Sequence, residues 1–185
     1  MATRGTRRGV GQLGRVHRRD LSRASRRRSA SSPTLSNVPV DDRSIAQLGT
    51  PDLQVSGFQL WVHGLAYPES SDPNDLGWLR TTAHVGSSGA SVWVSGVFLE
   101  ASDIQRFRDQ LASAYRAHAD DAILAGHEPH LEMRITNWDR LGNCRALVDL
   151  TPAPPTQRHR VEFAVDQSLV PAIIHDCDGI ARRLR

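Results

Sequence analysis

Residues 127–132 place two imidazoles three positions apart and a carboxylate two positions later. A bound transition metal needs three or four such ligands that converge on one point. Pro129 prevents a regular helix here, and on a strand His130 and Glu132 share one face while His127 precedes the strand. We therefore interpret this segment as the polar start of a strand and predict no metal site.

Cys177 is a candidate nucleophile that lies between two acids, Asp176 and Asp178. A reactive thiol needs a cationic partner that lowers its pKa, and two adjacent carboxylates have the opposite effect. The apolar stripe of the last predicted helix also places Cys177 inward. We predict that Cys177 is a buried structural residue, and we interpret Cys144, on the strand face of Ala146, in the same way.

Residues 86–89, Gly-Ser-Ser-Gly, form the loop that most resembles a phosphate-binding segment. Such a loop leads into a helix and usually carries a lysine, whereas here a strand follows and the chain has no lysine. We predict a hairpin turn. Because no Gly-x-Ser-x-Gly motif occurs either, we expect a protein that is not an enzyme and binds no cofactor. Catalysis by paired carboxylates in a cleft remains open, since it depends on separations in space that a sequence does not give.

The charge is distributed unevenly along the 185 residues. Residues 1–30 hold ten Arg and one acid, whereas residues 31–185 hold 13 Arg and 19 Asp and Glu. Residues 1–43 also lack hydrophobic periodicity, which predicts a disordered leader. An organelle transit peptide, a nucleic-acid-binding arm and translated leader DNA from a GC-rich genome all fit this composition. A secretory signal peptide does not, because no apolar stretch follows the first arginines.

Residues 44–185 have the periodicity of a single α+β domain. Apolar residues alternate in four segments, which predicts strands, and two more strands are predicted on either side of the hairpin-type connection at residues 86–89. Apolar residues recur every three or four positions in two other segments, which predicts helices. Turn residues separate the strands within each run, so we expect antiparallel sheets with the order βββαβββα. The predicted strands cover residues 58–62, 78–85, 92–99, 131–135, 144–150 and 161–165, and the helices begin near Ser102, with a capping box to Gln105, and near Ser168.

Trp61 shares a predicted strand face with Gln59 and His63. A tryptophan on a polar sheet face is a candidate anchor for a binding partner, or it is covered by another element of the same chain. No apolar run reaches the length of a membrane helix, so we expect a soluble, cytoplasmic protein with no membrane partner.

Several short motifs together resemble the WapI-like immunity proteins of bacterial polymorphic toxin systems. The likeness spans roughly residues 54–184, and the long basic leader is a departure from the family pattern. The motifs are residues 58–60, Tyr67-Pro68, residues 71–79 (Ser-Asp-Pro-Asn-Asp-Leu-Gly-Trp-Leu), the helix over 103–111, Glu128-Pro129-His130-Leu131 and Asp166-Gln167-Ser168-Leu169.

The resemblance implies a non-enzymatic protein that binds and blocks a cognate toxin domain. If that toxin is a nuclease, its basic substrate cleft would attract the acidic body of this chain. The candidate contacts are then Trp61 as the anchor and five acids, namely Glu69, Asp72, Asp75, Asp120 and Asp121. The alternatives are a protein that binds nucleic acid through the N-terminal arm and an uncharacterised small α+β binding domain.

We predict that residues 1–43 are dispensable for folding, because they add no apolar stripe to the core. Thermal melts of the full chain and of a 44–185 form, followed by circular dichroism, should agree within a few degrees. A much lower midpoint for the shorter form would show that the leader packs on the body.

Overall fold

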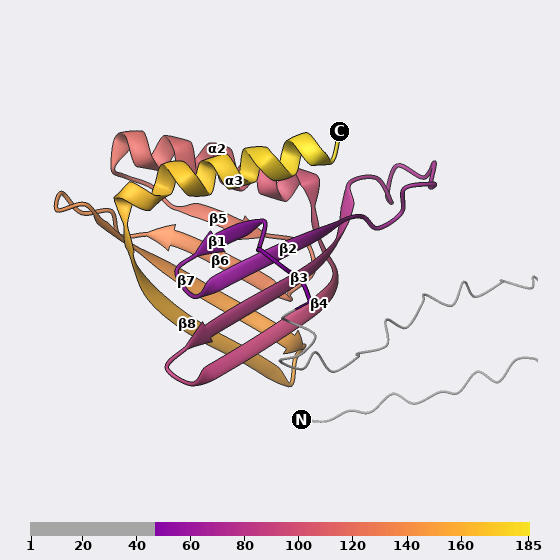
Figure 1. Cartoon of the computed structure of the whole chain (residues 1–185), viewed down its shortest axis with the longest axis horizontal. Helices are drawn as coiled ribbons and strands as arrows, with labels where there is room; N and C mark the ends of the chain where they lie inside the picture. Colours follow the sequence, from indigo (N-terminus) through magenta and orange to yellow (C-terminus); the bar gives the residue numbers. More distant parts are fainter. Residues whose placement is uncertain (1–46) are drawn as a thin grey trace, which may run out of the picture. The chain divides into compact units, whose positions relative to one another are not determined.

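A computed structural model of the chain describes residues 47–185, so the predicted leader lies outside the described residues. The described part contains two four-stranded antiparallel sheets and two long helices (Figure 1). The first half consists of β1 (Leu53–Val55), β2 (Phe58–Leu65), β3 (Trp78–Ser87), β4 (Ala90–Glu100) and α2 (Ala101–Ala117). The second half consists of β5 (Ala122–Ala125), β6 (Leu131–Thr136), β7 (Asn143–Ala153), β8 (Gln157–Asp166), the 3₁₀ turn η1 (Gln167–Leu169) and α3 (Val170–Arg183).

The predicted α+β class and the alternation of strand runs with helices are confirmed. Each run has one more strand than the sequence predicted, because β1 and β5 precede the two sets of three. The two additional strands have only three and four residues, too few to show a period of two. Both form sheet edges, since the strand orders are β1-β2-β3-β4 and β5-β6-β7-β8.

The two helices lie side by side along the edges formed by β1 and β5 (Figure 1). Helix α2 follows the first sheet but packs mainly on β5, and α3 follows the second sheet and packs on β1. Each helix buries one stripe, as the predicted spacing requires. The buried apolar residues are Ile104, Phe107, Leu111 and Ala114 on α2, and Val170, Ile173, Cys177 and Ile180 on α3.

Helix α2 begins two residues earlier than its predicted N-cap implies. Its N-cap is Glu100, and the capping box joins Glu100 to Asp103 rather than Ser102 to Gln105. The backbone amide of Glu100 donates to the Asp103 carboxylate at 2.8 Å, and Ser102 donates to the Glu100 carboxylate at 3.0 Å. The capping box therefore starts two residues before the predicted one, and both of its side chains are acidic.

Two glycines allow segments from different elements to touch. A Cβ on Gly57, in the β1–β2 turn, would lie 2.2 Å from the Gly86 carbonyl oxygen and 2.7 Å from the Phe163 ring of β8. A Cβ on Gly126, just after β5, would lie 2.0 Å from the carbonyl oxygen of Phe98 in β4. Since such distances are too short for a carbon atom, a larger residue at Gly57 would displace the backbone at Gly86 and the Phe163 ring, and one at Gly126 would force the end of β5 away from β4.

The predicted hairpin at residues 86–89 is present. Ser87 pairs with Ala90, and Ser88 and Gly89 both have positive φ, as a two-residue hairpin turn requires. In the part of the chain that the structure describes, no helix is long and apolar enough to cross a membrane.

Ile173→Ala should lower the free energy of unfolding by about 2–5 kcal/mol, as large-to-small changes in a core do. The Ile173 side chain is 2% exposed and belongs to the common core. Urea denaturation provides the measurement. The neighbouring Ile174, which is only partly buried against that core, supplies the control, and Ile174→Ala should cost clearly less. Equal losses for the two variants would mean that α3 does not use the stripe described above.

Candidate partner-binding surface

The connection between β2 and β3, residues 66–77, projects from one end of the first sheet (Figure 1). Two of its apolar side chains are unusually exposed, Tyr67 at 42% and Leu76 at 57%. Between them lie three of the predicted contact acids, of which Glu69 and Asp72 are exposed and Asp75 is half-buried. We call residues 66–77 the acidic loop.

The acidic loop is held by its own hydrogen bonds. The Asp72 carboxylate accepts from the backbone amide of Asn74 at 2.9 Å, and Ser70 donates to the Asp75 carboxylate at 2.7 Å. The indole of Trp78 donates to the Asn74 carbonyl at 2.9 Å and fixes the loop to the start of β3. A loop held in this way loses little conformational entropy when a partner binds.

The acidic loop contacts the start of α2. The backbone amide of Ala101 donates to the Gly77 carbonyl at 2.9 Å, and Trp78 pairs with Glu100 across β3 and β4. The His127 ring lies 6.3 Å from that of Trp78, and its Nε2 is 3.8 Å from a Glu100 carboxylate oxygen. This end of the molecule therefore combines the exposed apolar pair with the carboxylates of the loop and of Glu100.

Asp120 and Asp121 lie elsewhere, just beyond the C-terminal end of α2. Helix α2 has 17 residues, so about 25 Å separate them from the acidic loop at its other end. Asp121 accepts hydrogen bonds from Thr136 and from Arg134, the latter at 2.9 Å, and these two contacts lower the pKa of Asp121. Asp120 is exposed, with its backbone carbonyl bonded to the Trp138 indole. The five predicted acids thus form two separate groups, and Asp121 is already engaged within the fold.

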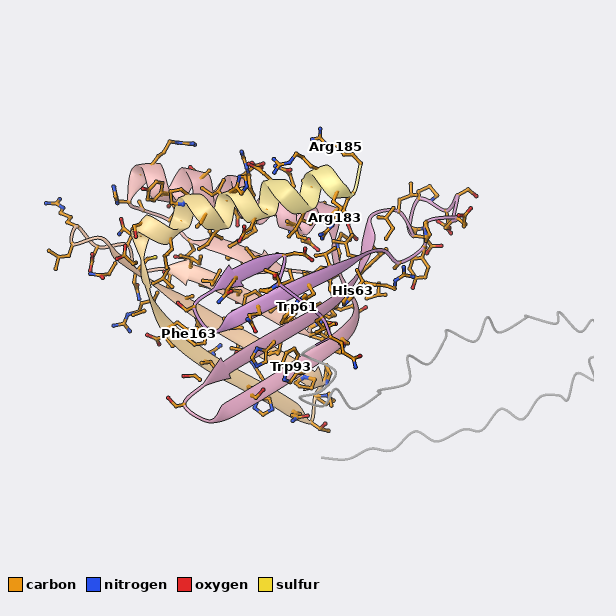
Figure 2. The ribbon with its side chains drawn as sticks, in the orientation of Figure 1. Trp61, His63, Trp93, Phe163, Arg183 and Arg185 are labelled. Carbon is orange, nitrogen blue, oxygen red and sulfur yellow. The ribbon has the colours of Figure 1, made fainter. Side chains whose placement is uncertain are left out.

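Trp61 lies on the outer face of the first sheet, as predicted, but only 4% of it is exposed. Its indole donates to the Gly49 carbonyl at 3.1 Å, and its ring stacks on that of Trp93 with centroids 5.7 Å apart (Figure 2). Trp93 in turn stacks on His84 at 3.9 Å. The anchor role of Trp61 stays a prediction, and a partner on this face would meet the more exposed Trp93 before it.

A hydroxyl–imidazole contact of the kind used in acyl transfer occurs on the same face. His63 Nε2 is 2.9 Å from the Thr82 hydroxyl, and that hydroxyl is 2.8 Å from the hydroxyl of Ser95. Burial lowers the pKa of His63, with Arg80 acting in the same direction. Thr82 is only 4% exposed, so a substrate would have no access to its oxygen. The contact therefore stabilises the sheet rather than forming a nucleophile and base.

The remaining residues that the sequence suggested for chemistry, two cysteines and two histidines, are buried or already contact other groups of the fold. Burial raises the pKa of the Cys144 thiol to about 11 and that of the Cys177 thiol to about 12, so both are protonated at neutral pH. His130 contacts the Thr151 carbonyl at 2.8 Å, while His127 faces Glu100. Within residues 47–185, no three His, Cys, Asp or Glu side chains form a group that could hold a metal ion.

The exposed Tyr67 and Leu76 were missed by the sequence analysis, which considered only the charges of this loop. Their positions, between turn residues and next to acids, give no signal of exposure by themselves. The contribution of Glu100 was missed for a different reason, since it depends on strand pairing that places Glu100 beside Trp78.

Comparison with protein families gives one match. Residues 50–185 match the model of the Immunity protein WapI-like family. Comparisons with curated proteins and with solved structures find no match.

Asp121→Asn should lower the melting temperature by about 2–4 °C at pH 7, because it weakens the contacts with Arg134 and Thr136. The lowered pKa means that the charged Asp121 stabilises the fold above the ordinary titration range of an aspartate, about pH 4, and that this stabilisation disappears as the pH falls below it. Melting curves from pH 7 to pH 3 should therefore converge for the wild type and the variant. Asp120→Asn is the control and should melt like the wild type, and a larger loss at Asp120 than at Asp121 would contradict the assignment.

Proposed function

Because the chain belongs to the WapI-like immunity protein family, we propose that it binds a cognate toxin domain made by the same bacterium and blocks it without catalysis. The observation that carries this proposal is the family match, which covers nearly all of the described residues. The cognate toxin of a polymorphic toxin system would be encoded beside the immunity gene, and the proposed place of binding is the cytoplasm.

The acidic loop and the adjoining start of α2 are the proposed binding surface. Protein interfaces combine a few apolar anchors with a polar rim, and Tyr67 and Leu76 flanked by Glu69 and Asp72 have this composition. The internal hydrogen bonds of the loop support the same choice, because they hold the surface in one shape before binding.

We propose further that the partner surface is basic, as the substrate cleft of a nuclease is. A protein that acts on nucleic acid places Arg and Lys where the phosphates bind. Carboxylates on the inhibitor would be attracted to that cleft and would occupy it in place of the phosphates. Asp120, at the far end of α2, would then lie outside the contact.

The direct test is co-expression with the toxin domain encoded beside the gene, scored for cell survival and for co-purification of the two chains. Survival together with a stable complex is the expected result. Cell death with folded protein present and no complex recovered would overturn the immunity proposal.

Replacing Asp72 and Asp75 together with Asn should slow association with that toxin domain about tenfold at low salt, with little change in dissociation. Asn can preserve the local turn of the loop while removing the charge, so the loop should keep its shape. Stopped-flow association at several salt concentrations measures the effect, which should diminish as salt rises. Asp120→Asn is the control; it removes one charge outside the loop and should have no effect. A slowing about half as large as that of the double variant, on a logarithmic scale, would show that the net charge of the protein acts rather than the loop.

A further inference from the structure

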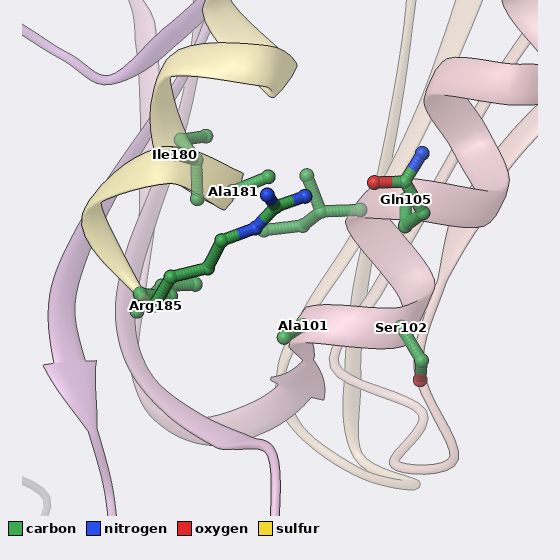
Figure 3. Close-up of a pocket in the computed structure, with 8 residues that line it drawn as sticks. Ala101, Ser102, Gln105, Ile180, Ala181 and Arg185 are labelled. Carbon is green, nitrogen blue, oxygen red and sulfur yellow. The ribbon is translucent and has the colours of Figure 1, made fainter.

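A cavity of about 270 Å³ lies between the first turn of α2 and the last turns of α3 (Figure 3). Its walls are mostly apolar and come from Ala101 and Ile104 on α2 and from Ile180, Ala181 and Leu184 on α3. The two alanines leave space where longer side chains would have filled the gap between the helices. The cavity is therefore an apolar recess at the surface of the helix pair.

The cavity adjoins the acidic loop directly. Ala101 forms part of its wall, and the same residue donates its backbone amide to the Gly77 carbonyl at 2.9 Å. The exposed Leu76 is the next residue along the loop, and Glu100, the N-cap of α2, precedes Ala101. The acidic loop and the cavity wall therefore meet at Ala101, so a partner seated on the loop would lie beside the cavity.

The two rims of the cavity carry opposite charges. Glu100 lies on the α2 side, where its carboxylate also accepts from Ser102 at 3.0 Å. Arg185 lies on the α3 side and is exposed. Figure 3 shows the Arg185 side chain extending from the end of α3 across the cavity towards Gln105. Arg185 therefore covers part of the recess.

We propose that this cavity receives one apolar side chain of the toxin domain, about the size of Leu or Phe, from a segment with a basic residue on the side facing Glu100 and the acidic loop. The inference rests on the proposed function. The volume lies just below the ~300–1,000 Å³ typical of small-molecule sites and suits a single anchor residue. Anchors that fill such pockets contribute most of the affinity of many interfaces, while surrounding polar contacts set orientation. The bound anchor would displace the Arg185 side chain.

Filling the cavity tests the proposal. Ala181→Trp should weaken binding to the toxin domain encoded beside the gene by about tenfold or more, mainly through faster dissociation. Biolayer interferometry with the full chain and a catalytically inactivated toxin domain provides the measurement. Ala172→Trp is the matched control, because Ala172 lies on the same helix, exposed and outside the cavity wall. Ala181→Leu is the second variant in case the tryptophan destabilises the fold, and thermal melts of all three verify folding.

Opening the cavity should have the opposite effect. Arg185→Ala removes the side chain that crosses the recess and should slow dissociation about twofold or more, since the anchor no longer displaces it. Arg182→Ala removes the same charge without opening the cavity, so it separates the steric effect from the electrostatic one.

If the wild type binds the toxin domain while the Ala181 variants bind equally well, the cavity proposal is wrong and the immunity function stands. If the folded wild type does not bind, both proposals fail.

Discussion

The fold depends on an exchange of helices between its two halves. Each half is a meander of four strands followed by a helix, and each helix covers the short edge strand of the other half, α2 on β5 and α3 on β1. An antiparallel sheet with one apolar face cannot bury that face by itself. Because the cover for each sheet comes from across the molecule, the apolar residues of both halves form one continuous core. The side chains of the two sheets and both helix stripes contribute to it.

This arrangement determines which surfaces remain available. Both helices lie along the β1 and β5 edges, so neither α2 nor α3 covers the outer face of the first sheet, with Trp93 and His63 (Figure 2). The connection after β2 is also left to project, and the same exchange brings the end of α3 next to the start of α2. The acidic loop and the cavity between the helices are therefore neighbours because of the topology, although Leu76 and Ala181 are far apart in sequence.

The sequence predicted the elements that repeat a pattern and missed those that do not. Period-two alternation identified β2, β6, β7 and β8, and the apolar stripes identified both helices. Strands β1 and β5 were missed because three or four residues give no period. The capping box was placed at Ser102 because serine is a strong N-cap residue, whereas Glu100 and Asp103 fill the two positions in the structure.

The site was predicted less completely, for a physical reason. A sequence shows which residues are charged but not which charges already have a charged partner, and Asp121 is paired with Arg134 whereas, among residues 47–185, the Asp72 carboxylate is bonded only to the neutral Asn74. Likewise the face of Trp61 followed from alternation, but its burial under Gly49 and Trp93 depends on contacts from other segments.

The pairing of Asp52 with Arg183 has a consequence for how the chain can be made. This ion pair joins the residue just before β1 to the end of α3, 131 positions later, and Arg183 also donates to the Val62 carbonyl at 3.2 Å. During synthesis the first sheet is complete long before α3 exists, so its edge at β1 stays uncovered until residues 170–183 leave the ribosome. Folding of this domain is therefore completed only after α3 has been made. A chain that stops before α3 lacks the helix that packs on β1, so it should not form a shorter functional domain. A break in the turn between α2 and β5 would give two fragments, each of which carries the helix that packs on the edge strand of the other.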